Sequence, residues 1–100
     1  MPDPRIWPVP SANDTFATVG VASAVVLAAN PNRVDCDFIN TSANWISLGR
    51  GNVAVLYSGE SLAPRGGSYH IGVDNLFLGA IFAIASGVDS NLSISEGTKP

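Results

Sequence analysis

The chain has 100 residues and a net charge of −3, with 13% charged and 46% hydrophobic residues. This length suits one domain, because single hydrophobic cores are usually built from about 100 to 150 residues. The five Lys and Arg residues are scattered along the chain, which excludes the clustered basic surface that nucleic-acid binding needs. Soluble domains normally have about a quarter of their residues charged, so we expect part of the apolar surface to meet another protein.

The sequence contains no recognisable export or membrane signal. Met1 is followed by Pro-Asp-Pro-Arg rather than by a cationic and then an apolar segment. No apolar run approaches the ~20 residues of a membrane span. We therefore expect a protein made in a cytoplasm, without a membrane partner. Small domains bury a modest fraction of their surface, and association with further copies would add stability.

Residues 1–15 form a proline-rich segment with four prolines. Each proline removes a backbone donor and restrains its neighbour to extended geometry, so neither a helix nor a central strand is expected there. We predict an extended N-terminal arm, 1–15, followed by a β-sandwich domain, 16–100. Ile6 and Trp7 are too large for the arm to bury against itself. Either the arm folds back across its own domain, or it lies over a neighbouring subunit with these two residues as anchors.

The rest of the chain is a series of short β-rich runs broken by Gly, Asn, Pro and Ser. This pattern predicts an all-β fold, a compact antiparallel β-sandwich or barrel of the jelly-roll kind, without helices. The predicted strands are residues 16–21, 24–29, 34–40, 44–49, 52–57, 67–72, 80–85 and 91–96.

The run VDCDFIN, residues 34–40, alternates apolar and polar side chains. Successive residues of a strand point to opposite faces, so Val34, Cys36 and Phe38 are predicted to share a packed face. Cys36 is interpreted as a small buried hydrophobe. Asn-Pro-Asn before this run is typical of a turn, and we expect residues 24–29 to pair with residues 34–40 across it.

A second hairpin is predicted from NWISLG and NVAVLY, residues 44–49 and 52–57, because Gly49 and Gly51 flank the short connection. Trp45 falls on the face opposite Ile46 and Leu48. We interpret it as a core or subunit contact rather than as a ligand-stacking residue.

Residues 76–86, LFLGAIFAIAS, are apolar on both faces of a predicted strand. Only one face of a strand meets the core of a small sandwich, so the second face needs another cover. A subunit interface is the simplest cover, with Phe77 and Phe82 as core or inter-subunit contacts.

Residues suited to catalysis or metal binding are few. His70 is the single histidine and lies beside no nucleophile motif, which indicates a surface or interface residue. Cys36 and His70 are too few for a structural zinc site. Asp35 and Asp37 share one strand face, where solvation explains them better than Ca²⁺ binding. We predict no catalytic residues, no metal and no cofactor, hence a protein that is not an enzyme.

Several motifs give a resemblance to a known group of proteins. The runs AVVLAANPNRV, FINTSANWISLGRG, SLAPRGGSYHIG, LFLGAIFAIASG and NLSISEG follow one another over residues 20–97. Their order resembles small virion proteins of tailed bacteriophages and prophages, including head decoration (cement) proteins. The resemblance implies a β-sandwich, often trimeric, bound to a capsid lattice from outside. The motifs are turn and core residues, and the arm lies outside them.

We therefore predict a structural virion protein that stabilises the outside of a phage capsid. Its expected partners are the major capsid protein and further copies of itself, as a homotrimer, on the capsid surface. The expected contacts are Ile6, Trp7, Trp45, Phe77 and Phe82. The alternative is a small tail or fibre module that recognises a cell-surface glycan through Trp45, Tyr57 and Tyr69.

Overall fold

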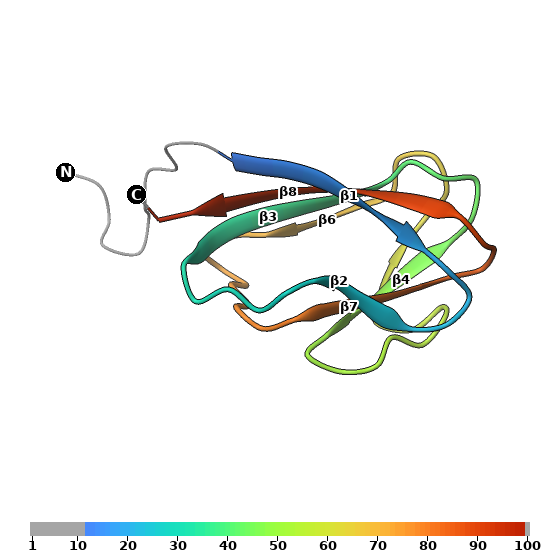
Figure 1. Ribbon diagram of the computed structural model, residues 1–100, viewed down its shortest axis with the longest axis horizontal. Coiled ribbons are helices and arrows are strands. Elements are labelled where there is room, and N and C mark those ends of the chain that lie inside the picture. The colour runs from blue at the N-terminus through green and yellow to red at the C-terminus, as the bar shows by residue number, and fades with distance from the viewer. Residues whose placement is uncertain (1–11, 100) are drawn as a thin grey trace.

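Eight β-strands, joined by turns and loops, build the part of the chain that the computed structural model describes, residues 12–99 (Figure 1). No helix of that part is long and apolar enough to cross a membrane. The predicted arm anchors Ile6 and Trp7 lie outside the described residues. The strands are β1 (Ala12–Val19), β2 (Ala24–Leu27), β3 (Arg33–Asn40), β4 (Ile46–Arg50), β5 (Glu60–Leu62), β6 (Ser68–Ile71), β7 (Ile81–Ala85) and β8 (Ser90–Thr98).

The strands form two antiparallel four-stranded sheets, β1-β8-β3-β6 and β2-β7-β4-β5, that face each other as a sandwich (Figure 1). The pairing is nested, because β1 pairs with β8, β2 with β7, β3 with β6 and β4 with β5. A long antiparallel ribbon folded over in this way is an eight-stranded jelly roll. The predicted all-β class and antiparallel β-sandwich are confirmed. β1 begins at Ala12 rather than at Phe16, so residues 12–15 pair with β8 instead of belonging to the arm.

The core lies between the inner faces of the two sheets. β3 supplies Cys36 and Phe38, which have no exposed surface, while Asp37 and Ile39 point outward. The predicted alternation is therefore confirmed for these residues, and Val34 is half-buried. The whole cluster of buried core residues is Val19, Cys36, Phe38, Ile46, Leu48, Leu62, Ile71, Ile81, Ala83, Ala85, Leu92 and Ile94.

The predicted pairing of residues 24–29 with residues 34–40 is wrong. β2 pairs with β7 in the second sheet, whereas β3 pairs with β6 and β8 in the first. The Asn-Pro-Asn segment therefore carries the chain from one sheet to the other. Arg33 fixes this crossing, because its side chain donates a hydrogen bond to the carbonyl oxygen of Ala28 at 2.7 Å.

The predicted hairpin of residues 44–49 and 52–57 is also wrong. Gly51, with φ +73°, turns the chain after β4, and residues 51–59 form a loop that lies on the outer face of the second sheet. We call this segment the covering loop. A Cβ on Gly49 would lie 2.5 Å from the carbonyl oxygen of Asn52, so the loop needs glycine at this strand position. β5, not residues 52–57, is the strand that pairs with β4.

Side-chain hydroxyls replace a strand partner for the covering loop. The backbone N–H of Ala54 donates to Oγ of Ser23 at 2.9 Å, and that of Tyr57 donates to Oγ of Ser47 at 2.8 Å. Buried backbone donors need such partners, whether they come from a strand or not. These two bonds hold the loop against the sheet without a ladder.

The strand predicted at residues 80–85 is confirmed as β7, whereas the rest of the apolar run 76–86 lies outside it. Only Ile81–Ala85 is extended as β7, and its inner residues Ile81, Ala83 and Ala85 are buried. On the outer face Phe82 is half-buried and pairs with Gly49, against which the covering loop lies. Part of the cover that we expected from a subunit interface therefore comes from the same chain.

Candidate interaction surface

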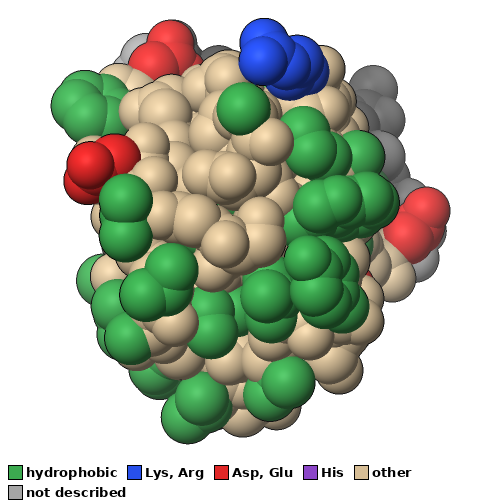
Figure 2. Space-filling model, turned by 90° about the vertical axis from the view of Figure 1, so that its right-hand side faces the viewer, with side chains coloured by type: hydrophobic (Ala, Val, Ile, Leu, Met, Phe, Trp, Pro, Cys, Tyr) green, Lys and Arg blue, Asp and Glu red, His purple; other side chains and the backbone are tan. Residues whose placement is uncertain are grey.

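Large apolar side chains are exposed on the outer side of the second sheet. Val25 lies on β2, Trp45 directly precedes β4, and the other members belong to the covering loop. Figure 2 shows hydrophobic side chains gathered most densely in the lower half of one end of the molecule, the half of the second sheet. We call the following set, with its exposed fractions, the apolar surface: Val25 (53%), Trp45 (40%), Val53 (67%), Val55 (60%) and Tyr57 (65%).

Successive side chains of the covering loop face the sheet and the solvent in turn, as they would in a strand. Ala54 is buried and Leu56 is half-buried, while Val53, Val55 and Tyr57 point away from the sheet. The apolar alternation of residues 52–57 thus places one set of side chains on the sheet and the other in solvent. Exposed apolar side chains are ordinary when single, but a group of them on one face marks an interaction site.

Trp45 and Tyr57 are neighbours on the apolar surface. Their rings meet edge to face, with 6.2 Å between centroids and 72° between planes. The backbone at Trp45 is fixed by Ser86, whose Oγ accepts from the Trp45 N–H at 3.0 Å. Tyr57 has φ +64°, a left-handed conformation that is uncommon for a bulky residue. Strained backbone of this kind is concentrated at functional sites, since it persists only where its surroundings enforce it.

The predicted contact residues fall in different places. Trp45 and Phe82 lie on the same side of the second sheet, the first exposed and the second half-buried. Phe77 is not on that surface. It is half-buried against the core, and its ring lies close to Gly51 and Gly79. Phe77 is therefore a packing residue that supports the start of the covering loop.

The outer face of the first sheet differs in character. The strand register aligns Asp14, Ser95, Asp37 and His70 in one row across four strands. Ser95 donates to Asp14 at 2.6 Å, and Nδ1 of His70 lies 2.6 Å from Oδ1 of Asp37. Both members of the His70–Asp37 pair are more than half exposed, so solvent surrounds them. Two large apolar side chains are also exposed on this face: Phe16 and Ile39.

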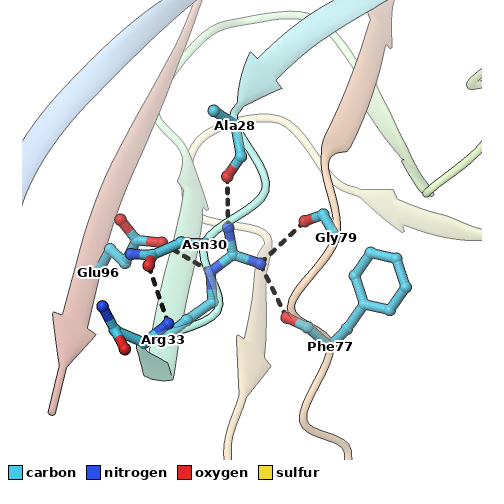
Figure 3. A network of polar contacts seen from close by, with 7 residues as sticks. Ala28, Asn30, Arg33, Phe77, Gly79 and Glu96 are labelled. Carbon is cyan, nitrogen blue, oxygen red and sulfur yellow. Dashed lines mark hydrogen bonds and ion pairs between the residues drawn. The ribbon is translucent and has the colours of Figure 1, made fainter.

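A buried arginine ties the sheets together at one end of β3. Arg33 has no exposed surface, and its Nε lies 2.6 Å from Oε2 of Glu96 on β8. Its Nη1 donates to the carbonyl oxygens of Phe77 and Gly79 at 2.8 and 3.0 Å. Figure 3 shows the guanidinium group enclosed by these carbonyls, that of Ala28 and the Glu96 carboxylate. Such complete pairing is what makes a buried charge tolerable.

A buried asparagine has the same function at the other end of β3. Nδ2 of Asn40 donates to the carbonyl oxygens of Asn44, Leu62 and Ala63 at 2.7, 3.1 and 3.1 Å. Its Oδ1 accepts from the backbone N–H and the hydroxyl of Ser42 at 3.0 and 2.6 Å. Neither Arg33 nor Asn40 stands out in the sequence as a functional residue, although they lie at the two ends of β3.

Within residues 12–99, no three His, Cys, Asp or Glu side chains lie close enough together to hold a metal ion. Cys36 is buried, and this burial raises the pKa of its thiol from 9.0 to about 12, with the Glu96 carboxylate adding to the rise. The thiol is thus held in its weakly reactive neutral form.

We predict that Cys36 reacts with a thiol reagent only when the chain unfolds. The pKa of the Cys36 thiol is higher in the folded chain than in the unfolded chain, so the unfolded chain loses the thiol proton first as the pH rises. Stability is therefore unaffected by this group below about pH 9 and falls as the pH rises from 9.0 to about 12. Absorbance of released thionitrobenzoate in native buffer and in denaturant measures the reaction. Fast labelling of the native protein would contradict the assignment.

Comparison of the chain with protein-family models, with curated protein sequences and with solved structures gave no match.

Proposed function

We propose that the protein is a structural subunit that binds the outside of a tailed-phage capsid and stabilises the shell, without catalysis. The observation that carries this proposal is the apolar surface. Stable protein interfaces bury about 1,600 Å² in total and have aromatic residues at their centre. Trp45 and Tyr57, with three exposed valines on the same side of the sheet, have the composition of such a centre.

The contrast between the two outer faces supports a one-sided attachment. The first sheet presents a row of carboxylate, hydroxyl and imidazole groups, which water solvates well, and two exposed apolar side chains, Phe16 and Ile39. The second sheet presents aliphatic and aromatic groups. A subunit that lies between a shell and solvent needs this division, because only one of its faces is desolvated.

The proposed assembly is a homotrimer on the major capsid protein, as the resemblance of residues 20–97 implies. Self-association covers part of the apolar surface, and the capsid covers the remainder. Repetition of one modest contact over a lattice gives strong attachment, because each bound copy holds its neighbours at high effective concentration. Jelly rolls are frequent in viral capsid domains and in lectins, which is support by analogy only.

The rival proposal, a glycan-binding tail or fibre module, needs Trp45, Tyr57 and Tyr69 to act together. Tyr69 is half-buried against the core, and the guanidinium group of Arg50 lies 5.9 Å from its ring centroid. One face of its ring is thus occupied. Trp45 and Tyr57 alone make a smaller platform, set edge to face rather than side by side.

Substitution of Val55 by aspartate tests the proposal. We expect binding to undecorated phage heads to weaken by at least about tenfold, because a charge in a desolvated contact costs well above the 1.4 kcal/mol that corresponds to tenfold. Co-sedimentation with heads measures the bound fraction. Phe16→Asp, at an exposed apolar residue of the first sheet (70% against 60% for Val55), is the matched control and should bind normally. Wild-type protein that ignores heads but binds host polysaccharide would favour the rival.

A further inference from the structure

A pocket of about 250 Å³ lies at one end of the sandwich, away from the apolar surface. Three segments form it: the turn before β3 and the start of that strand, the loop between β6 and β7, and the chain after β8. Most of the residues that line it are apolar. The lining residues are Pro31, Arg33, Val34, Val73, Leu76, Leu78 and Lys99.

We propose that this pocket is the docking site of the chain's own N-terminal segment, with the indole ring of Trp7 as its occupant. The size of the pocket supports a single large side chain. A cavity of about 150 Å³ holds a benzene molecule, whereas pockets for cofactors and drug-sized ligands have about 300–1,000 Å³. The volume of about 250 Å³ lies between these values, which suits an indole ring with part of its backbone.

The chemistry of the pocket also suits tryptophan. Val73, Leu76 and Leu78 are 44%, 46% and 38% exposed, so an apolar occupant would remove considerable apolar surface from water. Lys99 also lines the site and adds a cationic residue to it. Cations bind the face of an aromatic ring, and tryptophan is the strongest partner.

The chain enters the fold within reach of the pocket. Ala12 pairs with Gly97 of β8, and Gly97 pairs with Asp35 of β3, which adjoins the pocket residue Val34. Two strand spacings separate Ala12 from Asp35, about 10 Å in all. Trp7 lies five positions before Ala12, and an extended chain covers about 16 Å over that length at about 3.1 Å per residue.

Local features lower the free-energy cost of this docking. Prolines at positions 4, 8 and 10 restrict the segment around Trp7, which lowers the entropy lost when it is ordered. On the pocket side, the register of β3 against β8 shifts between Arg33 and Asp35, so Val34 is the extra residue of a bulge. Bulges re-aim side chains, and this one lies where the pocket begins.

Docking on the same chain is favoured over docking on a neighbour. A short tether holds Trp7 near its own pocket at an effective concentration in the millimolar range. This inference does not depend on the capsid role, because it concerns the isolated chain. Docking of this kind corresponds to the first of the two arrangements considered for Ile6 and Trp7, an arm that folds back across its own domain.

Tryptophan fluorescence of the Trp45→Phe variant tests the proposal, since Trp7 is then the only tryptophan. We expect emission at short wavelength and acrylamide quenching several-fold weaker than that of free N-acetyltryptophanamide, both independent of protein concentration. Adding Val73→Asp should shift the emission to longer wavelength and raise the quenching several-fold. Val88→Asp, an exposed valine in the turn before β8, is the matched control and should change neither value.

Each other outcome would overturn the proposal. A fully quenched Trp7 would show that the segment does not dock. Protection that survives Val73→Asp would place it elsewhere, and protection that disappears on dilution would place it on a second copy. Far-ultraviolet circular dichroism checks that the sheets are intact, and Leu76→Ser gives a milder second variant for the same comparison.

Discussion

Replacement of Arg33 by methionine is expected to lower the free energy of unfolding by about 3–5 kcal/mol, the usual cost of breaking a buried ion pair. The substitution leaves the Glu96 carboxylate, 10% exposed, without its partner. It also removes the donors for the carbonyl oxygens of Ala28, Phe77 and Gly79. Urea unfolding followed by circular dichroism measures the change.

Two further variants separate charge burial from general damage. Arg50→Met removes a cation whose Nη2 lies 3.6 Å from Oε1 of Glu60, in a pair that is 43% and 26% exposed. Its effect should stay within about 1 kcal/mol, because exposed pairs and single cation–π contacts contribute little. The double variant Arg33→Met, Glu96→Leu should recover part of the loss. An Arg33→Met protein as stable as wild type would refute the structural function of this network.

Conversion of Asn40 to aspartate should destabilise the fold by about 3 kcal/mol or more, although the side chain keeps its shape. In the wild-type protein, Nδ2 of Asn40 donates to three carbonyl oxygens, those of Asn44, Leu62 and Ala63. A carboxylate oxygen in place of Nδ2 would face these carbonyl oxygens, so that acceptor meets acceptor and each carbonyl loses its donor. Leaving one buried polar group without a partner costs about 1–3 kcal/mol. Thermal unfolding should show a drop of at least 10 °C, since about 4–8 °C corresponds to 1 kcal/mol at this size.

Asn91→Asp is the control for this prediction. Nδ2 of Asn91 donates at 2.6 Å to Oγ1 of Thr41 on the outer face of the first sheet, where water can replace the bond. We expect a change within about 0.5 kcal/mol. Equal effects of the two substitutions would mean that the bonds of Asn40 do not hold β3 to the segments after it.

Local patterns predicted the strands better than their pairing. The alternation of residues 34–40 located β3 and its buried face, because apolar side chains recur there at every second position, which is the period of a strand. The partners of β3 depend on contacts such as Arg33 with Glu96, which lie 63 positions apart. No local pattern contains that information, so the predicted pairing of residues 24–29 with residues 34–40 joined two strands that lie in different sheets.

The candidate surface was only partly predictable for a related reason. Residues 52–57 alternate as a strand does, yet they lie on a sheet as a loop held by Ser23 and Ser47. Both arrangements bury every second side chain, so the pattern cannot distinguish them. Trp45 was predicted as a contact because of its size and its face. Val53 and Val55 were assigned to a strand, which concealed that their side chains face solvent.

The most direct test of the central claim is cryo-electron microscopy of undecorated, expanded heads mixed with the purified protein. The account predicts density over the junctions between capsid subunits, at three-fold positions, with the apolar surface in contact and the Asp37–His70 face towards solvent. Bare heads at saturating protein concentration, or attachment through the outer face of the first sheet, would contradict it.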